Sequence, residues 1–107
     1  MIARAEVNML IHLVCWKYKT ETDAATGQEH IDRLRALKLI ISEVQTLEVG
    51  TDILHLERSF DTGLVATFAD RRGLDAYTDH PEHQKVAAIG RDISERVVSV
   101  DFLVDED

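Results

Sequence analysis

The chain has 107 residues, enough for one compact domain and too few for two. Twelve basic against twenty acidic residues give a formal net charge of −8, and a field of that sign repels phosphate backbones, so we expect no nucleic-acid partner. A single cysteine excludes an intramolecular disulfide, and no apolar run approaches the roughly 20 residues that span a bilayer, so we expect a cytoplasmic protein without a membrane segment.

The first predicted element is a strand over 9–19, because its residues alternate between two faces. One face carries Met9, Ile11, Leu13 and Cys15. The other face carries Leu10, His12, Val14, Trp16 and Tyr18. A strand that is largely apolar on both faces needs cover on both sides of its sheet. We interpret residues 1–8 as an N-terminal extension and residues 9–107 as the domain.

An amphipathic helix is predicted next, beginning at Thr22 or Thr26. Thr26 and Glu29 have the spacing of a capping box, which is typical of helix starts. The apolar stripe that this helix buries consists of Ile31, Leu34, Leu37 and Ile41. A second strand follows over 43–49, where residues alternate again, and we expect Gly50 to end it.

The second half of the chain begins with a polar loop over 51–61 and a strand over 62–69. Asp70 is suited to cap a short helix, and Pro81 fits the first turn of a further helix, so the pattern predicts a helix broken just before this proline. The last strand covers 96–104. Its apolar face carries Val98, Val100, Phe102 and Val104.

The order of these elements is a βαββαβ pattern. Right-handed crossovers in both halves place the helical segments on one face of the sheet, which predicts an α+β fold with a ferredoxin-like antiparallel sheet. The first strand is apolar on both faces, and the helices cover only one. We therefore expect a second copy to pack sheet against sheet as a homodimer; the alternative is that the loop over 51–61 folds over its own sheet.

Five segments in order along the chain carry a more specific pattern, at residues 12–19, 47–50, 61–68, 76–83 and 98–102. The fourth is the most telling, because Tyr77 is followed by His-Pro-x-His. Together they resemble the stress-responsive A/B barrel (Dabb) domain family. The resemblance implies a ferredoxin-like protomer and a dimeric α+β barrel formed by two sheets. Members commonly carry Pro-Gly before the second strand, where this chain has Ile40-Ile41-Ser42-Glu43.

The candidate site residues lie at the predicted helix break and on the first strand. By resemblance to a plant polyketide cyclase in the family, Tyr77 and His83 match catalytic residues. The substrate-binding candidates are His12, Val14, Trp16, Phe68 and His80. A neutral imidazole beside a phenol suits removal of a proton from an activated carbon. The alternative is structural: Tyr77 and His80 close the helix break by hydrogen bonds, and His12 is a satisfied buried histidine.

Several functions fit these residues. The first is a homodimer that binds a small apolar or aromatic molecule between sheet and helices, in a cavity lined by Val14, Trp16, Leu34, Phe68 and Tyr77. The second is a cofactor-free lyase or cyclase in which His83 is the general base and Tyr77 the oxyanion partner. A cofactor-free monooxygenase and a purely structural stress protein are further alternatives.

The remaining polar residues suggest no additional chemistry. We expect no cofactor, because the chain has no glycine-rich phosphate loop. We expect no metal site, because His80 and His83 lack a second cluster of ligands. We interpret His30 and His55 as solvent-facing and Cys15 as a core thiol.

Overall fold

The structure is a computed structural model that describes residues 7–106, with side chains from residue 9 to residue 105. In chain order, the helices and strands within this range are β1 (Val7–Tyr18), α1 (Ala24–Ile40), β2 (Thr46–Thr51), β3 (Thr62–Phe68), α2 (Arg71–Asp79), α3 (Pro81–Ile93) and β4 (Ser94–Glu106). The strands form one antiparallel sheet in the spatial order β2-β3-β1-β4. The predicted ferredoxin-like α+β fold is confirmed. Within residues 7–106, no helix is both long enough and apolar enough to cross a membrane.

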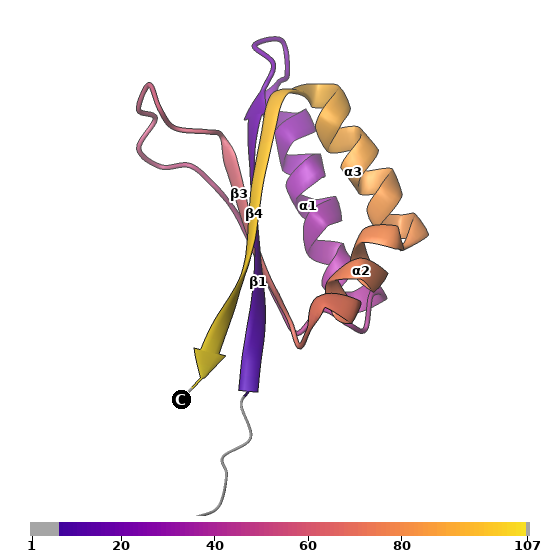
Figure 1. Cartoon of the computed structure of the whole chain (residues 1–107). Helices are drawn as coiled ribbons and strands as arrows, with labels where there is room; N and C mark the ends of the chain where they lie inside the picture. Colours follow the sequence, from indigo (N-terminus) through magenta and orange to yellow (C-terminus); the bar gives the residue numbers. More distant parts are fainter. Residues whose placement is uncertain (1–6, 107) are drawn as a thin grey trace, which may run out of the picture.

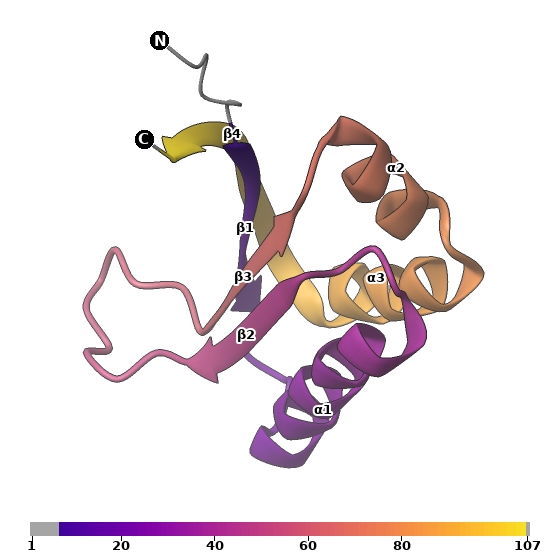
Figure 2. The ribbon, with the colours of Figure 1, turned by 90° about the horizontal axis from the view of Figure 1, so that it is seen from below.

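All three helices lie on the same face of the sheet, which Figure 1 shows nearly edge-on and Figure 2 shows from below. The antiparallel register sets His12 of β1 beside Ala66 of β3 and Asp101 of β4. Alternation from His12 then places Val14 and Trp16 on the helix-covered face, where Trp16 is buried. The first strand therefore directs its histidine toward the helices.

The core fills the space between this face and the helices. Strand residues that are buried there include Leu10, Trp16, Leu64, Ala66 and Phe68. Helix residues that pack against them include Ile31, Leu34, Leu37, Tyr77 and Val86. Three members of the expected stripe are thus confirmed on α1, whereas the fourth, Ile41, is buried but follows the end of the helix as its C-cap. Tyr77 and Phe68 are among the most deeply buried large side chains.

The opposite, open face of the sheet is apolar over β1 and β4 and is exposed to solvent in the single chain. Val98, Val100, Phe102 and Val104 of β4 are paired with Cys15, Leu13, Ile11 and Met9 of β1. The four β4 side chains are 37% to 53% exposed. The alternative in which the β2–β3 loop folds over this face is wrong, because Ile53 and Leu54 of that loop are 85% and 65% exposed.

Several element boundaries differ from those predicted. The first helix begins at Ala24, because the Asp23 side chain accepts a hydrogen bond of 2.8 Å from the Thr26 backbone N–H and so caps the helix in place of Thr22 or Thr26. Strand β2 begins at Thr46 rather than at residue 43, because the backbone from Ile41 to Val44 forms a turn.

At three other boundaries a strand extends further than predicted. Gly50 does not end β2: it pairs with Gly63, and the strand continues to Thr51. Strand β4 begins directly after α3, at Ser94, two residues before the predicted start. Strand β1 begins at Val7, so the last two residues of the expected extension over 1–8 belong to it, and residues 1–6 lie outside the described residues.

Candidate functional site

The break between α2 and α3 builds the centre of the candidate site. The Asp70 side chain caps α2 by accepting from Gly73 N–H at 3.0 Å, and α2 ends at Asp79. His80 then caps α3, because its Nδ1 accepts from Glu82 N–H at 3.1 Å. This turn sets Tyr77, in the last turn of α2, against His83, in the first turn of α3, with 4.3 Å between ring centroids.

Tyr77 is enclosed by rings from three elements. Its side chain is 1% exposed, and its ring centroid lies 5.2 Å from that of Phe68 and 5.9 Å from that of His12. Burial raises the pKa of the Tyr77 hydroxyl to about 12, since the phenolate would lose its hydration. The phenol therefore stays protonated at neutral pH and is available as a hydrogen-bond donor.

His83 is held in one tautomer by the backbone. Its Nδ1 lies 3.1 Å from the Thr78 carbonyl oxygen, and because a carbonyl only accepts, Nδ1 carries the hydrogen. Burial lowers the pKa of His83 below its ordinary value of 6.5, so the ring is neutral at pH 7. Its Nε2 then carries the free lone pair, which is the atom a general base needs.

His12 is oriented by a carboxylate that the sequence analysis did not identify. The Asp101 side chain accepts a hydrogen bond from His12 Nδ1. The two residues are direct partners in the β1–β4 ladder, although 89 positions separate them in the chain. The available signal was the alternation of β4, which places Asp101 on the face opposite to Val100 and Phe102 and therefore on the same side of the sheet as its partner His12.

The predicted site residues divide into two groups. The structure brings together Tyr77, His83, His12 and Phe68, with ring centroids of neighbouring pairs 4.3 to 6.4 Å apart. We refer to these four residues as the ring cluster. His80 is engaged in capping α3. Among residues 7–106, no three His, Cys, Asp or Glu side chains are grouped closely enough to hold a metal ion.

The other two candidates on β1, Val14 and Trp16, belong to the core rather than to the ring cluster. Val14 is partly buried and packs against the core, and Trp16 is 6% exposed. The Trp16 ring meets that of His30 edge to face at 5.0 Å. His30 was expected to face solvent, which is wrong: it is 1% exposed, because the rotation of α1 turns it toward the sheet.

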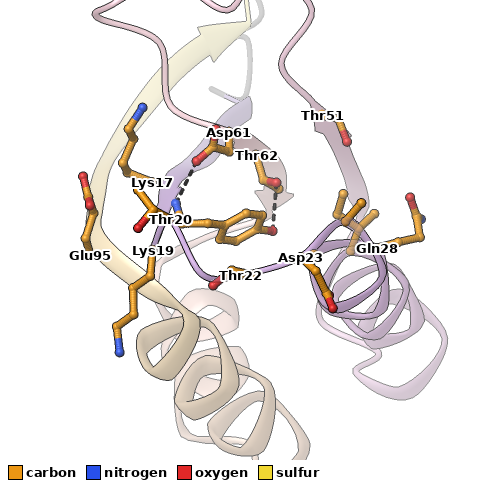
Figure 3. Close-up of a pocket in the computed structure, with 14 residues that line it drawn as sticks. Lys17, Lys19, Thr20, Thr22, Asp23, Gln28, Thr51, Asp61, Thr62 and Glu95 are labelled. Carbon is orange, nitrogen blue, oxygen red and sulfur yellow. Dashed lines mark hydrogen bonds between the residues drawn. The ribbon is translucent and has the colours of Figure 1, made fainter.

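An open pocket of about 560 Å³ lies near the far end of β1 (Figure 3). Its wall includes Tyr18 and Thr62, whose hydroxyl groups are hydrogen-bonded at 2.9 Å, and the start of α1 around Asp23. None of the predicted site residues lines it. Tyr18 is six residues from His12, or roughly 20 Å along the strand, so this pocket is separate from the ring cluster.

Comparison with known proteins gives a family match. The model of the family described as Stress responsive A/B Barrel Domain matches residues 10–104. No curated protein matches the chain.

Solved structures with the same fold cover nearly the whole chain. A dimeric ferredoxin-like protein of unknown function from Thermobifida fusca is 24% identical with a TM-score of 0.83, over 91% of this chain and 92% of that chain. A Dabb family protein from Mesorhizobium loti is 21% identical with a TM-score of 0.74, over 89% and 95%. A hydroxynitrile lyase from Passiflora edulis is 18% identical with a TM-score of 0.83, over 92% and 95%.

Proposed function

The chain belongs to the stress responsive A/B barrel domain family, as its five ordered segments predicted, and we propose that it is a homodimer that binds a small apolar or aromatic molecule at the ring cluster. The observation that carries this proposal is the meeting of Tyr77, His83 and His12 at the break between α2 and α3. Small-molecule sites typically combine apolar walls, here Phe68, with a few converging polar groups.

The homodimer is proposed to form through the open face of the sheet. Contiguous exposed apolar patches beyond a few hundred Å² are rare on monomers. A second copy related by a two-fold axis covers such a face with the same face of its partner, and packed sheets of this kind lie about 10 Å apart. The description of a protein of the same fold from Thermobifida fusca as dimeric supports a dimer, although it does not say which faces meet.

A titration with 4-ethylphenol tests the binding proposal. We expect saturable shifts of the His83 and His12 ring signals in NMR spectra, because both rings border the proposed site. The exposed ring of His55 serves as the internal control and should not shift. Tyr77→Phe keeps the packing and removes the hydroxyl, so it should weaken binding. The absence of any saturable shift with 4-ethylphenol or with benzaldehyde would contradict the proposal and favour a structural role.

A cofactor-free lyase is the second candidate, favoured by the fixed tautomer of His83. Its neutral Nε2 is free to remove a proton from a substrate, while the Tyr77 phenol donates a hydrogen bond to the oxygen that becomes negative. The likeness of the fold to the Passiflora edulis lyase suggests hydroxynitriles as substrates to test.

Cleavage of mandelonitrile tests the lyase directly. His83 Nε2 takes the hydroxyl proton, the bond between the carbinol carbon and the nitrile carbon breaks, and benzaldehyde forms. The departing cyanide receives that proton from His83 and leaves as hydrogen cyanide. We expect His83→Ala to abolish benzaldehyde release while 4-ethylphenol affinity is retained, and His55→Ala to change neither. Benzaldehyde release no faster than in buffer alone would contradict this second candidate.

A further inference from the structure

The loop between β2 and β3, residues 52–61, is an ordered projection, which we call the arm. The Asp52 backbone N–H donates to the Asp61 carbonyl at 2.8 Å and closes its base. Asp61 then fastens this base to β1: its N–H donates to the Trp16 carbonyl at 2.8 Å, and its carboxylate accepts from the Tyr18 N–H at 2.8 Å. The arm therefore has a fixed direction relative to the sheet.

Two turns hold the outer part of the arm in shape. The Asp52 carboxylate accepts from the His55 N–H at 2.6 Å, and His55 adopts a left-handed conformation with a φ of 53°. Leu56 and Ser59 exchange two hydrogen bonds, from Leu56 N–H to the Ser59 hydroxyl at 3.1 Å and from Ser59 N–H to the Leu56 carbonyl at 2.9 Å. The outer part of the arm is thus held in shape by its own polar groups.

Three large apolar side chains of the arm are exposed to solvent. Ile53 is 85% exposed, Leu54 is 65% exposed and Leu56 is 39% exposed. Three large apolar residues within four positions of an ordered loop form a cluster, whereas single exposed apolar residues are common on protein surfaces. Such a cluster indicates an interaction surface.

The arm projects on the same side of the sheet as the open face. In both views the arm projects from the side of the sheet that is opposite to the helices, which is the side of the open face (Figures 1 and 2). The open face is apolar over β1 and β4 but polar over β2, where Thr46 and Glu48 are exposed. A second sheet that packs on the apolar surface of β1 and β4 therefore lies on the side of the sheet toward which the arm projects.

We propose that the arm packs Ile53, Leu54 and Leu56 against the second copy of this chain, and so clasps the sheet-to-sheet dimer. This inference rests on the homodimer of the proposed function. A second copy is the occupant that the geometry favours, because the exposed apolar cluster of the arm and the exposed apolar strip of β4 then become buried in one continuous interface.

Sedimentation equilibrium of a double variant of the full chain, Ile53→Ser with Leu54→Ser, tests the clasp. We expect the dissociation constant of the dimer to rise at least about tenfold, with an unchanged circular dichroism spectrum because both residues are exposed in the protomer. Leu39→Ser is the matched control, since Leu39 is 91% exposed on α1 in the helical layer, and it should leave the dissociation constant unchanged.

Hydroxyl-radical footprinting of the unmodified chain gives an independent measurement. As the concentration rises through the dissociation constant, Ile53 and Leu54 should become protected from oxidation while Leu39 does not. If the double substitution leaves the dissociation constant unchanged and the arm is not protected, the clasp is wrong. The proposed dimer is not contradicted by that result. At a protomer concentration of about 100 μM, even a weak specific dimer should be populated. A wild-type chain that stays monomeric at this concentration overturns both the dimer and the clasp.

Discussion

Burial of His30 should make the stability of this protein fall steeply in mild acid. His30 is 1% exposed on the buried side of α1, and its Nδ1 is 2.9 Å from the Tyr18 hydroxyl. Within the described part of the chain, its Nε2 has no hydrogen-bond partner. Desolvation lowers the pKa of His30 from 6.5 to about 4, because a buried imidazolium would have neither water nor a counter-charge.

The sign and size of the effect follow from this pKa. Above pH 6.5 the ring is neutral in both the folded and the unfolded chain, so its contribution to stability is fully present. Between pH 6.5 and pH 4 the unfolded chain binds a proton at His30 and the folded chain does not, so the free energy of unfolding falls as the pH falls. A difference of about 2.5 between the two pKa values corresponds to a loss of roughly 3 kcal/mol at pH 4.

Urea unfolding followed by circular dichroism between pH 8 and pH 4 measures this loss. The protomer concentration must be held constant, because dimerisation also contributes to apparent stability. The quantity to compare is the free energy of unfolding of the wild-type chain minus that of His30→Gln. This difference should be constant from pH 8 to pH 7 and should decrease by about 3 kcal/mol as the pH falls to 4. His55→Gln, at a position where the side chain is 75% exposed, should parallel the wild type. Parallel curves for the wild type and His30→Gln would refute the reasoning.

Three further predictions concern packing, assembly and catalysis. A Cβ at Gly90 would lie 2.8 Å from Trp16 Nε1 and 2.9 Å from His30 Nε2, so Gly90→Ala should destabilise the fold by about 1–3 kcal/mol in urea melts; an unchanged midpoint would contradict this packing. Val100→Asp places a charge on the open face where the side chain is 53% exposed, so it should convert the proposed dimer to monomer in sedimentation experiments without loss of helicity. If mandelonitrile is cleaved, the acid limb of kcat/KM should titrate below pH 6.5, because burial lowers the pKa of His83; a limb above pH 6.5 would exclude this residue as the base.

The two histidines of the ring cluster are positioned in the same way from opposite layers. His12 on the sheet donates through Nδ1 to Asp101, and His83 on α3 donates through Nδ1 to the Thr78 carbonyl. In both rings the nitrogen that these hydrogen bonds leave available is therefore Nε2. Tyr77 lies against both rings, which makes it the common neighbour of the two histidines. Both Tyr77→Phe and His83→Ala are informative for this reason.

Much of the candidate site could be predicted locally. Tyr77 and His83 are six positions apart, and the intervening His-Pro sequence ends one helix and begins the next, so their meeting depends on a short segment. The alternation of β1 likewise indicated two apolar faces before any fold was known. The pairing of His12 with Asp101 was not predictable in this way, because it requires the register of two strands whose residues are 89 positions apart.

The amino-acid sequence by itself determined the order of elements, the ferredoxin-like layers and the family, because the periods of strands and helices repeat over a few residues. Tertiary structure decided three other features: the burial of His30, the carboxylate beside His12 and the side of the sheet from which the arm projects. Each of these depends on how an element is rotated or registered against distant parts of the chain. The rotation and register of an element are those that minimise the free energy of the whole packed core, so they cannot be predicted from a local sequence pattern.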